Sequence, residues 1–143
     1  MDKYECLKLK NQLCFPLYSA SNAITRRYKP LLKELDLTYT QYIVMMVLWE
    51  YGTISARDLG KKLYLDSGTL TPLLKKMEKD GFVTRRRSDE DERVTLVRIT
   101  DKGMALRDPA AEIPFQVGGC LKLPAEDAQN LYQIMYKLLG EFS

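Results

Sequence analysis

The feature that most constrains this chain is a pair of short helices separated by a five-residue turn. Ser55 begins a capping box, so a helix is expected from there to Leu63. Residues 64–68 include Asp, Ser and Gly, which are typical of turns. A second helix is expected over 69–79 and ends at Gly81, because glycine tolerates the left-handed conformation that closes many helices. The spacing predicts a helix-turn-helix.

Two strands with a polar tip follow this helix pair. Residues 82–87 and 94–99 have strand character, and the loop 88–92 between them reads Ser-Asp-Glu-Asp-Glu. Helix, turn, helix and a two-stranded ribbon form the order of a winged helix-turn-helix. An ordinary α+β core with a charged hairpin is the alternative, because a helix-turn-helix pattern alone also occurs by chance.

Helices are expected on the N-terminal side of this segment. The first covers residues 15–34, with Pro16 in its first turn and Cys14 just outside it. Pro30 is expected to bend or break its end. A capping box at 38–41 opens the next helix, which is apolar almost all round and therefore buried.

The C-terminal part is expected to be helical as well. Thr100 is expected to cap a helix to about Arg107, and the last helix begins after Pro124. Four residues are expected to break up the stretch between them: Pro109, Pro114, Gly118 and Gly119. The last helix carries an apolar stripe of Leu131, Ile134, Met135, Leu138 and Leu139. The chain is thus expected to be one mainly α domain over 1–143, in which 1–35 and 105–143 are dimerisation helices and 36–104 is the winged helix-turn-helix.

Charge is concentrated around the helix pair and the wing. The 143 residues carry 22 basic and 19 acidic side chains, a formal net charge of only +3. Nine of the basic and four of the acidic side chains lie between Arg57 and Arg87. A basic patch on a near-neutral protein predicts a polyanion contacted through one face, although most charged side chains are simply solvated.

The residues expected to contact double-stranded DNA lie on the second helix and the wing. Short hydroxyls at a helix start suit phosphates or base edges, and the free N–H groups there reinforce anion binding. An arginine of the wing can enter a minor groove, held by a neighbouring carboxylate. The predicted contacts are Ser67, Thr69, Thr71, Lys75, Lys76, Arg85, Arg86, Asp91 and Arg93.

The chain has no histidine and three cysteines, Cys6, Cys14 and Cys120. No catalytic residue, metal or cofactor is expected. An odd number of widely spaced cysteines argues against a disulfide framework or a zinc ribbon, and leaves inert buried thiols or a reactive thiol. We expect a cytoplasmic protein without membrane association, because residues 1–10 lack a signal-peptide core and no apolar run could span a bilayer.

Several strings, spread over almost the whole chain, carry a resemblance to a known family. They occupy residues 11–15, 17–21, 28–32, 37–42, 63–75 and 89–93. Together they resemble the organic hydroperoxide-sensing repressors of the MarR family. Leu-Cys-Phe at 13–15 and Leu-Asp-Ser-Gly-Thr-Leu-Thr-Pro at 65–72 are specific to this branch. The resemblance implies a homodimer joined through its terminal helices, an inverted-repeat operator and repression relieved by peroxide.

The resemblance also implies a sensor site. Cys14 matches the peroxidatic cysteine, Tyr28 and Tyr39 match tyrosines that hydrogen-bond its sulfur, and Tyr18 matches one that lines the pocket. Only a thiolate attacks a peroxide, and phenolic donors near a helix N-terminus stabilise that anion. Four apolar residues near Cys14 are expected to favour organic peroxides: Leu13, Phe15, Leu17 and Met45. Without the resemblance, Cys14 would be a small buried hydrophobe and the tyrosines core aromatics.

Cys120 is placed where two-cysteine members of the family carry a resolving thiol, so we expect an intersubunit disulfide between Cys14 and Cys120 on oxidation. Its formation would rotate the two DNA-binding lobes out of register with successive grooves. A low-molecular-weight thiol is the alternative partner of Cys14, and Cys6 has no matching role. Three alternatives to a hydroperoxide sensor remain: a regulator that binds an aromatic ligand, a sensor of oxidants in general, and a thiol peroxidase.

Overall fold

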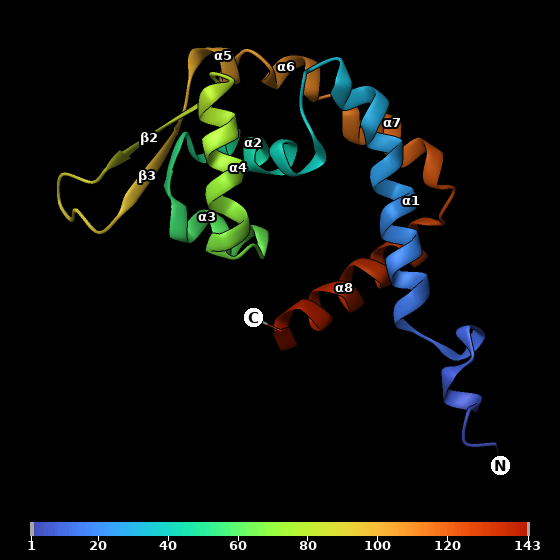
Figure 1. Cartoon of the computed structure of the whole chain (residues 1–143). Helices are drawn as coiled ribbons and strands as arrows, with labels where there is room; N and C mark the ends of the chain where they lie inside the picture. The colour runs from blue at the N-terminus through green and yellow to red at the C-terminus, as the bar shows by residue number, and fades with distance from the viewer. Residues whose placement is uncertain (1, 143) are drawn as a thin grey trace. The chain divides into compact units, whose positions relative to one another are not determined.

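The computed structural model describes residues 2–142 (Figure 1). It divides into two compact units, Met1–Tyr39 and Thr40–Ser143, which are described separately below. The N-terminal unit contains two 3-10 turns, η1 (Glu5–Leu7) and η2 (Leu9–Asn11), and the long helix α1 (Cys14–Lys33). No helix among the described residues has the length and apolar character needed to cross a membrane.

Helix α1 begins and ends one residue earlier than expected. Cys14 is its first residue rather than a residue outside it. Pro16 is tolerated in the first turn, because the N–H groups there have no carbonyl partner within the helix. Pro30 lies inside the helix, which nevertheless continues to Lys33. Of the bend or break expected at this proline, the break does not occur, since only one intrahelical hydrogen bond is lost so close to the end.

The described part of the second unit contains ten further helices and strands. They are α2 (Tyr39–Tyr51), which begins at the unit boundary, β1 (Thr53–Ser55), α3 (Ala56–Leu63), α4 (Ser67–Lys79), β2 (Val83–Arg87), β3 (Thr95–Ile99), α5 (Asp101–Met104), α6 (Arg107–Ala110), α7 (Ile113–Leu121) and α8 (Ala125–Phe142). The predicted helix-turn-helix is α3 and α4, and the predicted wing is the antiparallel hairpin of β2 and β3. The mainly α winged-helix fold is confirmed.

The sheet has three strands, in the order β1-β3-β2, rather than the two of the wing alone. Thr53 pairs with Arg98 and Ser55 with Leu96, so β1 completes the base of the wing. A strand of three residues is too short to show an alternating pattern, which is why the sequence did not reveal it. Gly52, at φ 74°, makes the turn from α2 into this strand.

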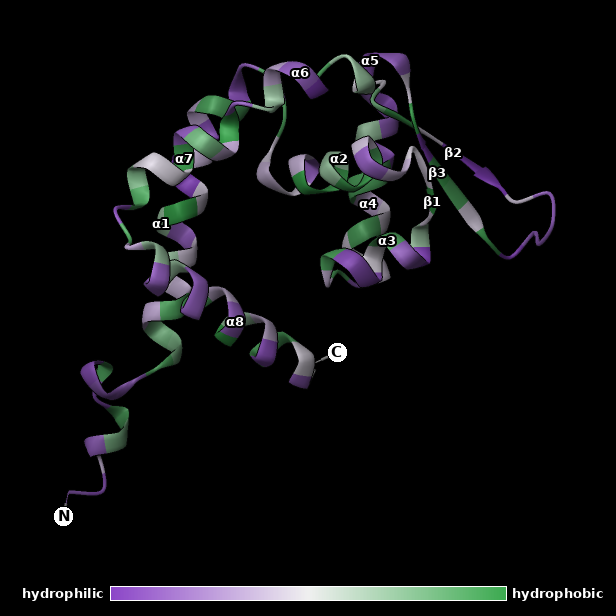
Figure 2. Ribbon diagram, turned by 180° about the vertical axis from the view of Figure 1, so that it is seen from behind, coloured by the Kyte–Doolittle hydropathy of each residue, from purple (hydrophilic) through white to green (hydrophobic). Residues whose placement is uncertain are grey.

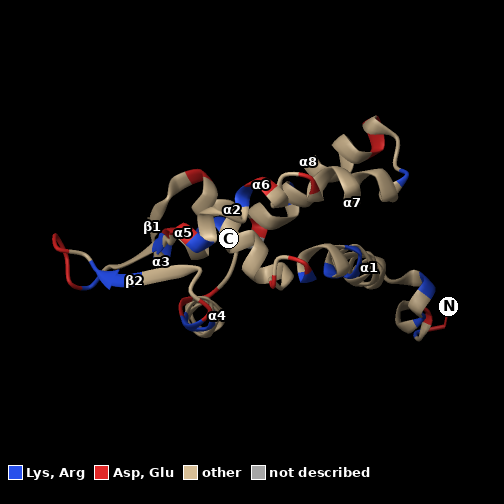
Figure 3. Ribbon diagram, turned by 90° about the horizontal axis from the view of Figure 1, so that it is seen from above, with Lys and Arg blue, Asp and Glu red and all other residues tan. Residues whose placement is uncertain are grey.

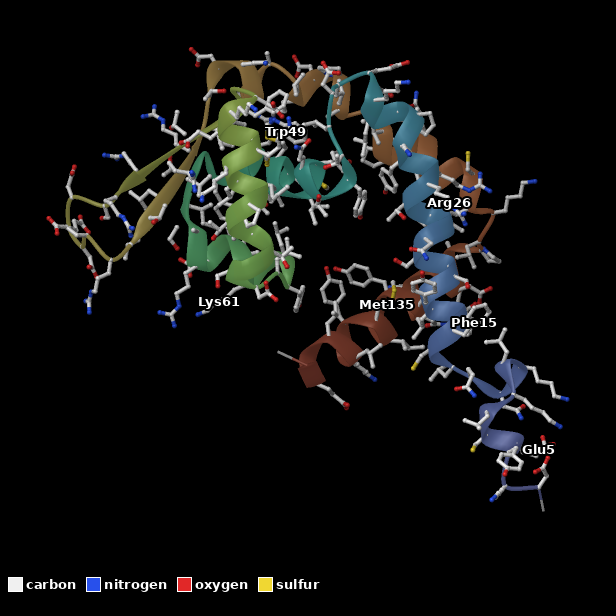
Figure 4. The ribbon with its side chains drawn as sticks, viewed as in Figure 1. Glu5, Phe15, Arg26, Trp49, Lys61 and Met135 are labelled. Atoms are coloured by element: carbon white, nitrogen blue, oxygen red, sulfur yellow. The ribbon has the colours of Figure 1, made fainter. Side chains whose placement is uncertain are left out.

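The core of the second unit lies between α2, the helix pair and the sheet. Its most deeply buried side chains are Val44, Met45, Leu48, Leu59, Leu74, Met77, Val83 and Val97. Trp49 donates its indole N–H to the Gly103 carbonyl at 3.0 Å, which ties α2 to α5 (Figure 4). A Cβ atom at Gly103 would lie 2.6 Å from the Phe82 carbonyl oxygen, so this contact requires glycine.

Three boundaries differ from those expected. Helix α4 begins at Ser67 rather than Thr69, because Asp66 is its N-cap and accepts the Thr69 N–H at 2.8 Å. The helix capped by Thr100 ends at Met104, and a separate short helix, α6, follows. Gly118 and Gly119 do not break the chain but lie inside α7, which buries Ile113 and Val117.

Candidate nucleic-acid interface and thiol site

Helix α4 has one buried face and one open face. Leu70, Leu74 and Met77 are buried at the i, i+4 and i+7 positions. The other face carries the residues expected to contact DNA, which are exposed: Ser67, Thr69, Thr71, Lys75 and Lys76. In Figure 3, α4 is seen nearly end-on, and its ribbon carries both basic and acidic positions. The packing of α4 therefore leaves open a polar face whose hydroxyls lie at the N-terminal end of the helix, a position that favours anions, and whose lysines lie in its C-terminal half.

The wing holds one arginine in a defined orientation. Arg93 donates from Nε to Asp91 Oδ1 at 3.1 Å and from Nη2 to Asp91 Oδ2 at 3.1 Å. Its backbone N–H also donates to Asp91 Oδ1, at 3.0 Å. These bonds lower the pKa of Asp91, the side-chain bond contributing most. The carboxylate predicted to hold a wing arginine is thus present, and the Arg93 side chain is 91% exposed.

The two arginines predicted from β2 point to opposite sides of the strand. Successive side chains of a strand alternate between its faces, and Arg85 shares the face of the buried Val83. Arg85 is paired with Glu78 of α4 at 3.1 Å. Arg86 lies on the other face, is 60% exposed and is 3.6 Å from Asp89. The structure therefore does not bring all the predicted wing arginines together on one surface.

Two basic residues were missed by the sequence reading. Arg57 and Lys61, both exposed on α3, line a hollow that Arg93 and Thr95 of the wing also line. Figure 4 labels Lys61 on this helix. The two residues are four apart on the first helix of the pair, so they lie on the same face of that helix. This spacing is the sequence signal that could have identified them. The hollow lies between α3 and the loop end of the wing.

Cys14 lies in the first turn of α1 and is exposed. Leu13 and Phe15 beside it are 78% and 44% exposed, and Leu17 is also exposed (Figure 4). Tyr18, four residues further along and so on the same face of the helix, is 67% exposed. The thiol therefore lies among apolar side chains that the N-terminal unit leaves open.

The other two predicted sensor tyrosines contact each other. The rings of Tyr28 and Tyr39 meet edge to face, with centroids 5.1 Å apart. Burial of Tyr39 raises the pKa of its phenol, and the neighbouring Tyr28 raises it further. The Tyr39 hydroxyl therefore stays protonated at neutral pH and is able to donate a hydrogen bond.

Helix geometry separates Cys14 from this tyrosine pair. Both Cys14 and Tyr28 lie on α1, and the helix is continuous between them. Fourteen residues at 1.5 Å each place them about 21 Å apart along the axis. That distance is much longer than a tyrosine side chain, so the thiol and Tyr28 of one chain do not meet. Tyr39 packs on Tyr28 and is held at the same end.

The other two cysteines lie in different surroundings. Cys120 is exposed in the last turn of α7, rather than in the loop expected from its glycines. The left-handed Lys122, at φ 49°, ends that helix two residues later. Cys6 is exposed in η1, and its Sγ lies 3.4 Å from the Lys3 carbonyl oxygen.

Helix α8 presents the apolar stripe that its sequence predicted. Leu131, Ile134, Met135 and Leu138 are between 38% and 62% exposed. Figure 2 shows apolar positions along α8 as well as along α1 and α7. A row of exposed apolar side chains on one helix of a small protein is typical of a surface that another chain covers.

The matching protein family decides the class of this protein. Residues 26–109, more than half of the chain, match the transcriptional regulator family SarA/Rot. The chain belongs to this family of regulators. The organic hydroperoxide resistance transcriptional regulator of Bacillus subtilis is 47% identical to it over 138 residues, which cover 96% of this chain and 94% of the relative. The resemblance to the hydroperoxide regulators of the MarR family is confirmed.

Solved structures of AbfR from Staphylococcus epidermidis have the same fold. Reduced AbfR bound to DNA matches with a TM-score of 0.79 and 33% identity, over 99% of both chains. AbfR with its disulfide formed matches with a TM-score of 0.67 and 34% identity, over 96% of both chains. This SarA/Rot regulator therefore resembles a protein that has been solved both on DNA and in an oxidised state.

Proposed function

We propose that this regulator is a redox-controlled repressor that binds an inverted-repeat operator as a homodimer and leaves it when an organic hydroperoxide oxidises Cys14. The observation that carries the proposal is the position of Cys14. Its thiol is exposed in the first turn of α1, and the Tyr28–Tyr39 pair lies at the other end of the same helix. A second copy running the opposite way along α1 would bring its tyrosine pair to this thiol.

The DNA-binding part of the proposal rests on α4 and the wing. The exposed hydroxyls and lysines of α4 suit a major groove, and Arg93, held by Asp91, suits the adjacent minor groove. Arg57 and Lys61 of α3 would contact the phosphates between them. The structure of reduced AbfR bound to DNA supports this assignment, because it matches nearly the whole chain.

The homodimer accounts for surfaces that one chain leaves open. Ile134 on α8 and Leu13 at the start of α1 are 62% and 78% exposed. Burial of such side chains contributes roughly 25 cal/mol per Å² of apolar area, which favours association. Two identical subunits related by a two-fold axis bind two half-sites of opposite orientation about one helical turn apart, so the operator is an inverted repeat.

The proposed signal is a balanced two-electron oxidation. The Cys14 thiolate attacks the terminal oxygen of the hydroperoxide, the O–O bond breaks, and the alcohol leaves after taking up a proton. The sulfur becomes a sulfenic acid, which a second thiol converts to a disulfide with release of water. Hydrogen bonds from Tyr28 and Tyr39 of the partner would stabilise the attacking thiolate. Because each event consumes the thiol until a reductant restores it, the protein acts as a sensor and not as an enzyme.

The surroundings of Cys14 favour organic over hydrogen peroxide. The exposed Leu13, Phe15 and Leu17 would contact the carbon chain of a bound hydroperoxide. Met45, which the sequence reading placed in this group, is instead fully buried in the core of the other unit, where its methyl group lies against Gly103. We therefore assign the preference to the three residues on and before α1.

The experiment is a gel-shift titration against the promoter of the regulator's own gene, with and without cumene hydroperoxide. The wild type should bind and be released by the peroxide. Cys14→Ser should bind equally well and stay bound, because serine cannot be oxidised. Cys6→Ser is the matched control and should behave as the wild type. A Cys14→Ser protein that still leaves the DNA on peroxide treatment contradicts the proposal.

A further inference from the structure

One ion pair joins the wing to α4. Glu78, close to the C-terminal end of α4, accepts two hydrogen bonds from Arg85 of β2. The backbone N–H of Arg85 donates to Oε2 at 2.9 Å, and its guanidinium Nη2 donates to Oε1 at 3.1 Å. The two residues are seven apart in sequence, across the turn where α4 ends and β2 begins (Figure 1). One carboxylate therefore bonds both the backbone and the side chain of the same wing residue.

The backbone bond has a structural reason. The strand order β1-β3-β2 makes β2 an edge strand. Arg85 lies opposite Val97 of β3, yet its N–H points to Glu78 and therefore away from β3. An edge N–H that is partly buried and unpaired destabilises the fold, and Glu78 supplies the missing acceptor. The carboxylate thus accepts the hydrogen bond of an edge N–H on the side of the wing next to α4.

The guanidinium of Arg85 is kept within the protein. Its side chain is 23% exposed, against 60% for Arg86 and 91% for Arg93. Among the side chains that the structure describes, Arg85 Nε is the buried nitrogen without a hydrogen-bond partner. To reach DNA, this side chain would have to break its bond to Glu78 and leave that carboxylate facing the phosphate backbone.

The charge of Glu78 fits the same arrangement. The hydrogen bonds from Arg85 lower the pKa of Glu78, the side-chain bond contributing most. The carboxylate therefore remains ionised at neutral pH and keeps both bonds.

We propose that Glu78 and Arg85 form a positioning clamp, which fixes the wing relative to α4 so that Arg93 and the exposed face of α4 reach adjacent grooves together. Arg85 does not itself contact DNA. This inference rests on the proposed DNA-binding role of α4 and the wing. It gives Arg85, which the sequence predicted to contact DNA, a positioning role instead. Arg86, the other arginine of β2 predicted to contact DNA, is exposed and keeps that prediction.

The clamp and a direct DNA contact predict opposite effects of Glu78→Gln. If Arg85 bound a phosphate in competition with Glu78, removing the acid would free the arginine and tighten DNA binding. If the pair is a clamp, the same change weakens binding about tenfold, because a charge-assisted bond that orients the wing is lost. The sign of the change therefore separates the two roles.

The test is a set of fluorescence anisotropy titrations on an operator duplex at several salt concentrations. Glu78→Gln and Arg85→Gln should each weaken binding about tenfold, the double variant should be no weaker than either, and the salt dependence should stay unchanged. Arg86→Gln, the matched control, should reduce the salt slope by about one. Tighter binding by Glu78→Gln, or a reduced salt slope for Arg85→Gln, would overturn the clamp.

Hydrogen exchange tests the clamp without DNA and also checks folding. Glu78→Gln should speed exchange of the Arg85 amide and of β2, while the amides of α2 exchange as in the wild type. Arg85→Lys, which keeps the positive charge and N–H donors, should speed exchange less than Glu78→Gln does. If the wild type binds no operator duplex, the proposed function fails, but exchange still decides the clamp. Unchanged exchange of β2 in Glu78→Gln overturns it.

Discussion

Helices α1 and α4 carry the two functions proposed for this chain, and they differ in how much of their surface the chain itself covers. Helix α4 buries Leu70, Leu74 and Met77 and exposes a polar face. Of the 20 residues of α1, only Leu32 is buried, and Phe15 and Tyr18 remain open. In the proposed function, one chain therefore carries all the residues of one DNA-contacting surface, whereas the thiol site takes its tyrosines from a second chain.

In the proposed function, this difference explains how one protein would both read DNA and sense an oxidant. A rigid, fully packed helix presents its side chains in fixed positions, as groove recognition requires. A thiol whose hydrogen-bond donors come from another subunit couples its own chemistry to the arrangement of the dimer. Oxidation of Cys14 would then change the subunit interface rather than the DNA-contacting surface, and the interface sets the spacing of the two α4 helices.

The largest effect is expected from the core of the DNA-binding part. Leu74→Ala removes a side chain that is 2% exposed and leaves a cavity, so we expect it to lower the free energy of unfolding by about 2–5 kcal/mol. Urea unfolding followed by circular dichroism measures this. The loss should not depend on protein concentration, because the contacts lie within one chain. A loss below about 1 kcal/mol would mean that α4 is not packed as described.

A substitution on the exposed apolar face of α8 should weaken dimerisation rather than the folding of one chain. Ile134 is 62% exposed, so Ile134→Asp costs a single chain little. In a dimer it would bury an unpaired carboxylate, and we expect the dissociation constant to rise at least about tenfold. Sedimentation equilibrium measures the change, with Gln133→Asp on the same helix as the control for added charge. An unchanged dimer would place the subunit interface elsewhere.

Removing single DNA contacts should have a smaller effect. Arg93→Ala is expected to weaken operator binding by about 1–3 kcal/mol and to relax discrimination at the minor-groove position that it reads. Lys75→Ala should weaken binding to all sequences alike and reduce the salt slope by about one. Titrations on operator and scrambled duplexes separate the two effects. Unchanged affinity of both variants for the operator contradicts the docking of α4 and the wing.

The DNA-binding part was largely predictable because its signals are local. Ser55 caps α3 through the Asp58 N–H, as the capping box indicated, and Gly81 ends α4 with φ 86°. The wing follows from two runs of strand-forming residues around an acidic loop. What the sequence did not show is which arginine of β2 faces inward, because that depends on where Glu78 lies across the turn.

For the thiol site, the sequence predicted which residues belong to it but not where they lie. The resemblance singled out Cys14, Tyr28 and Tyr39, but not their separation along the axis. That separation follows only once α1 is known to be continuous past Pro16. The glycines before Cys120 likewise predicted a loop, whereas burial of neighbouring apolar residues in α7 stabilises a helix despite the cost of about 1 kcal/mol for each glycine.

The origin of the tyrosine donors can be tested in mixed dimers. Tyr28→Phe with Tyr39→Phe in both subunits should slow Cys14 oxidation about tenfold or more, since hydrogen bonds to a charged group are lost. A heterodimer of this double variant with Cys14→Ser keeps one thiol, on the chain without tyrosines. If the donors act across the dimer, that thiol reacts at the wild-type rate. A slow heterodimer would mean that the tyrosines act on their own chain.

The smallest effect on DNA release is expected from Cys120→Ser, although it changes the oxidised product completely. A sulfenic acid at Cys14 can be attacked by the other subunit's Cys120, which forms a disulfide and releases water, or by a small thiol from solution. A disulfide needs Cα atoms within roughly 7 Å, so Cys120, exposed at the end of α7 next to a left-handed Lys122, must be able to approach α1 of the other chain. On a non-reducing gel, the peroxide-treated wild type and Cys6→Ser should run as covalent dimers and Cys120→Ser as a monomer. When a small thiol is present, Cys120→Ser should still leave the operator, because either product caps the Cys14 sulfur. A wild type that stays monomeric and gains only the mass of the small thiol would show that Cys120 takes no part, and that Cys14 alone carries the signal.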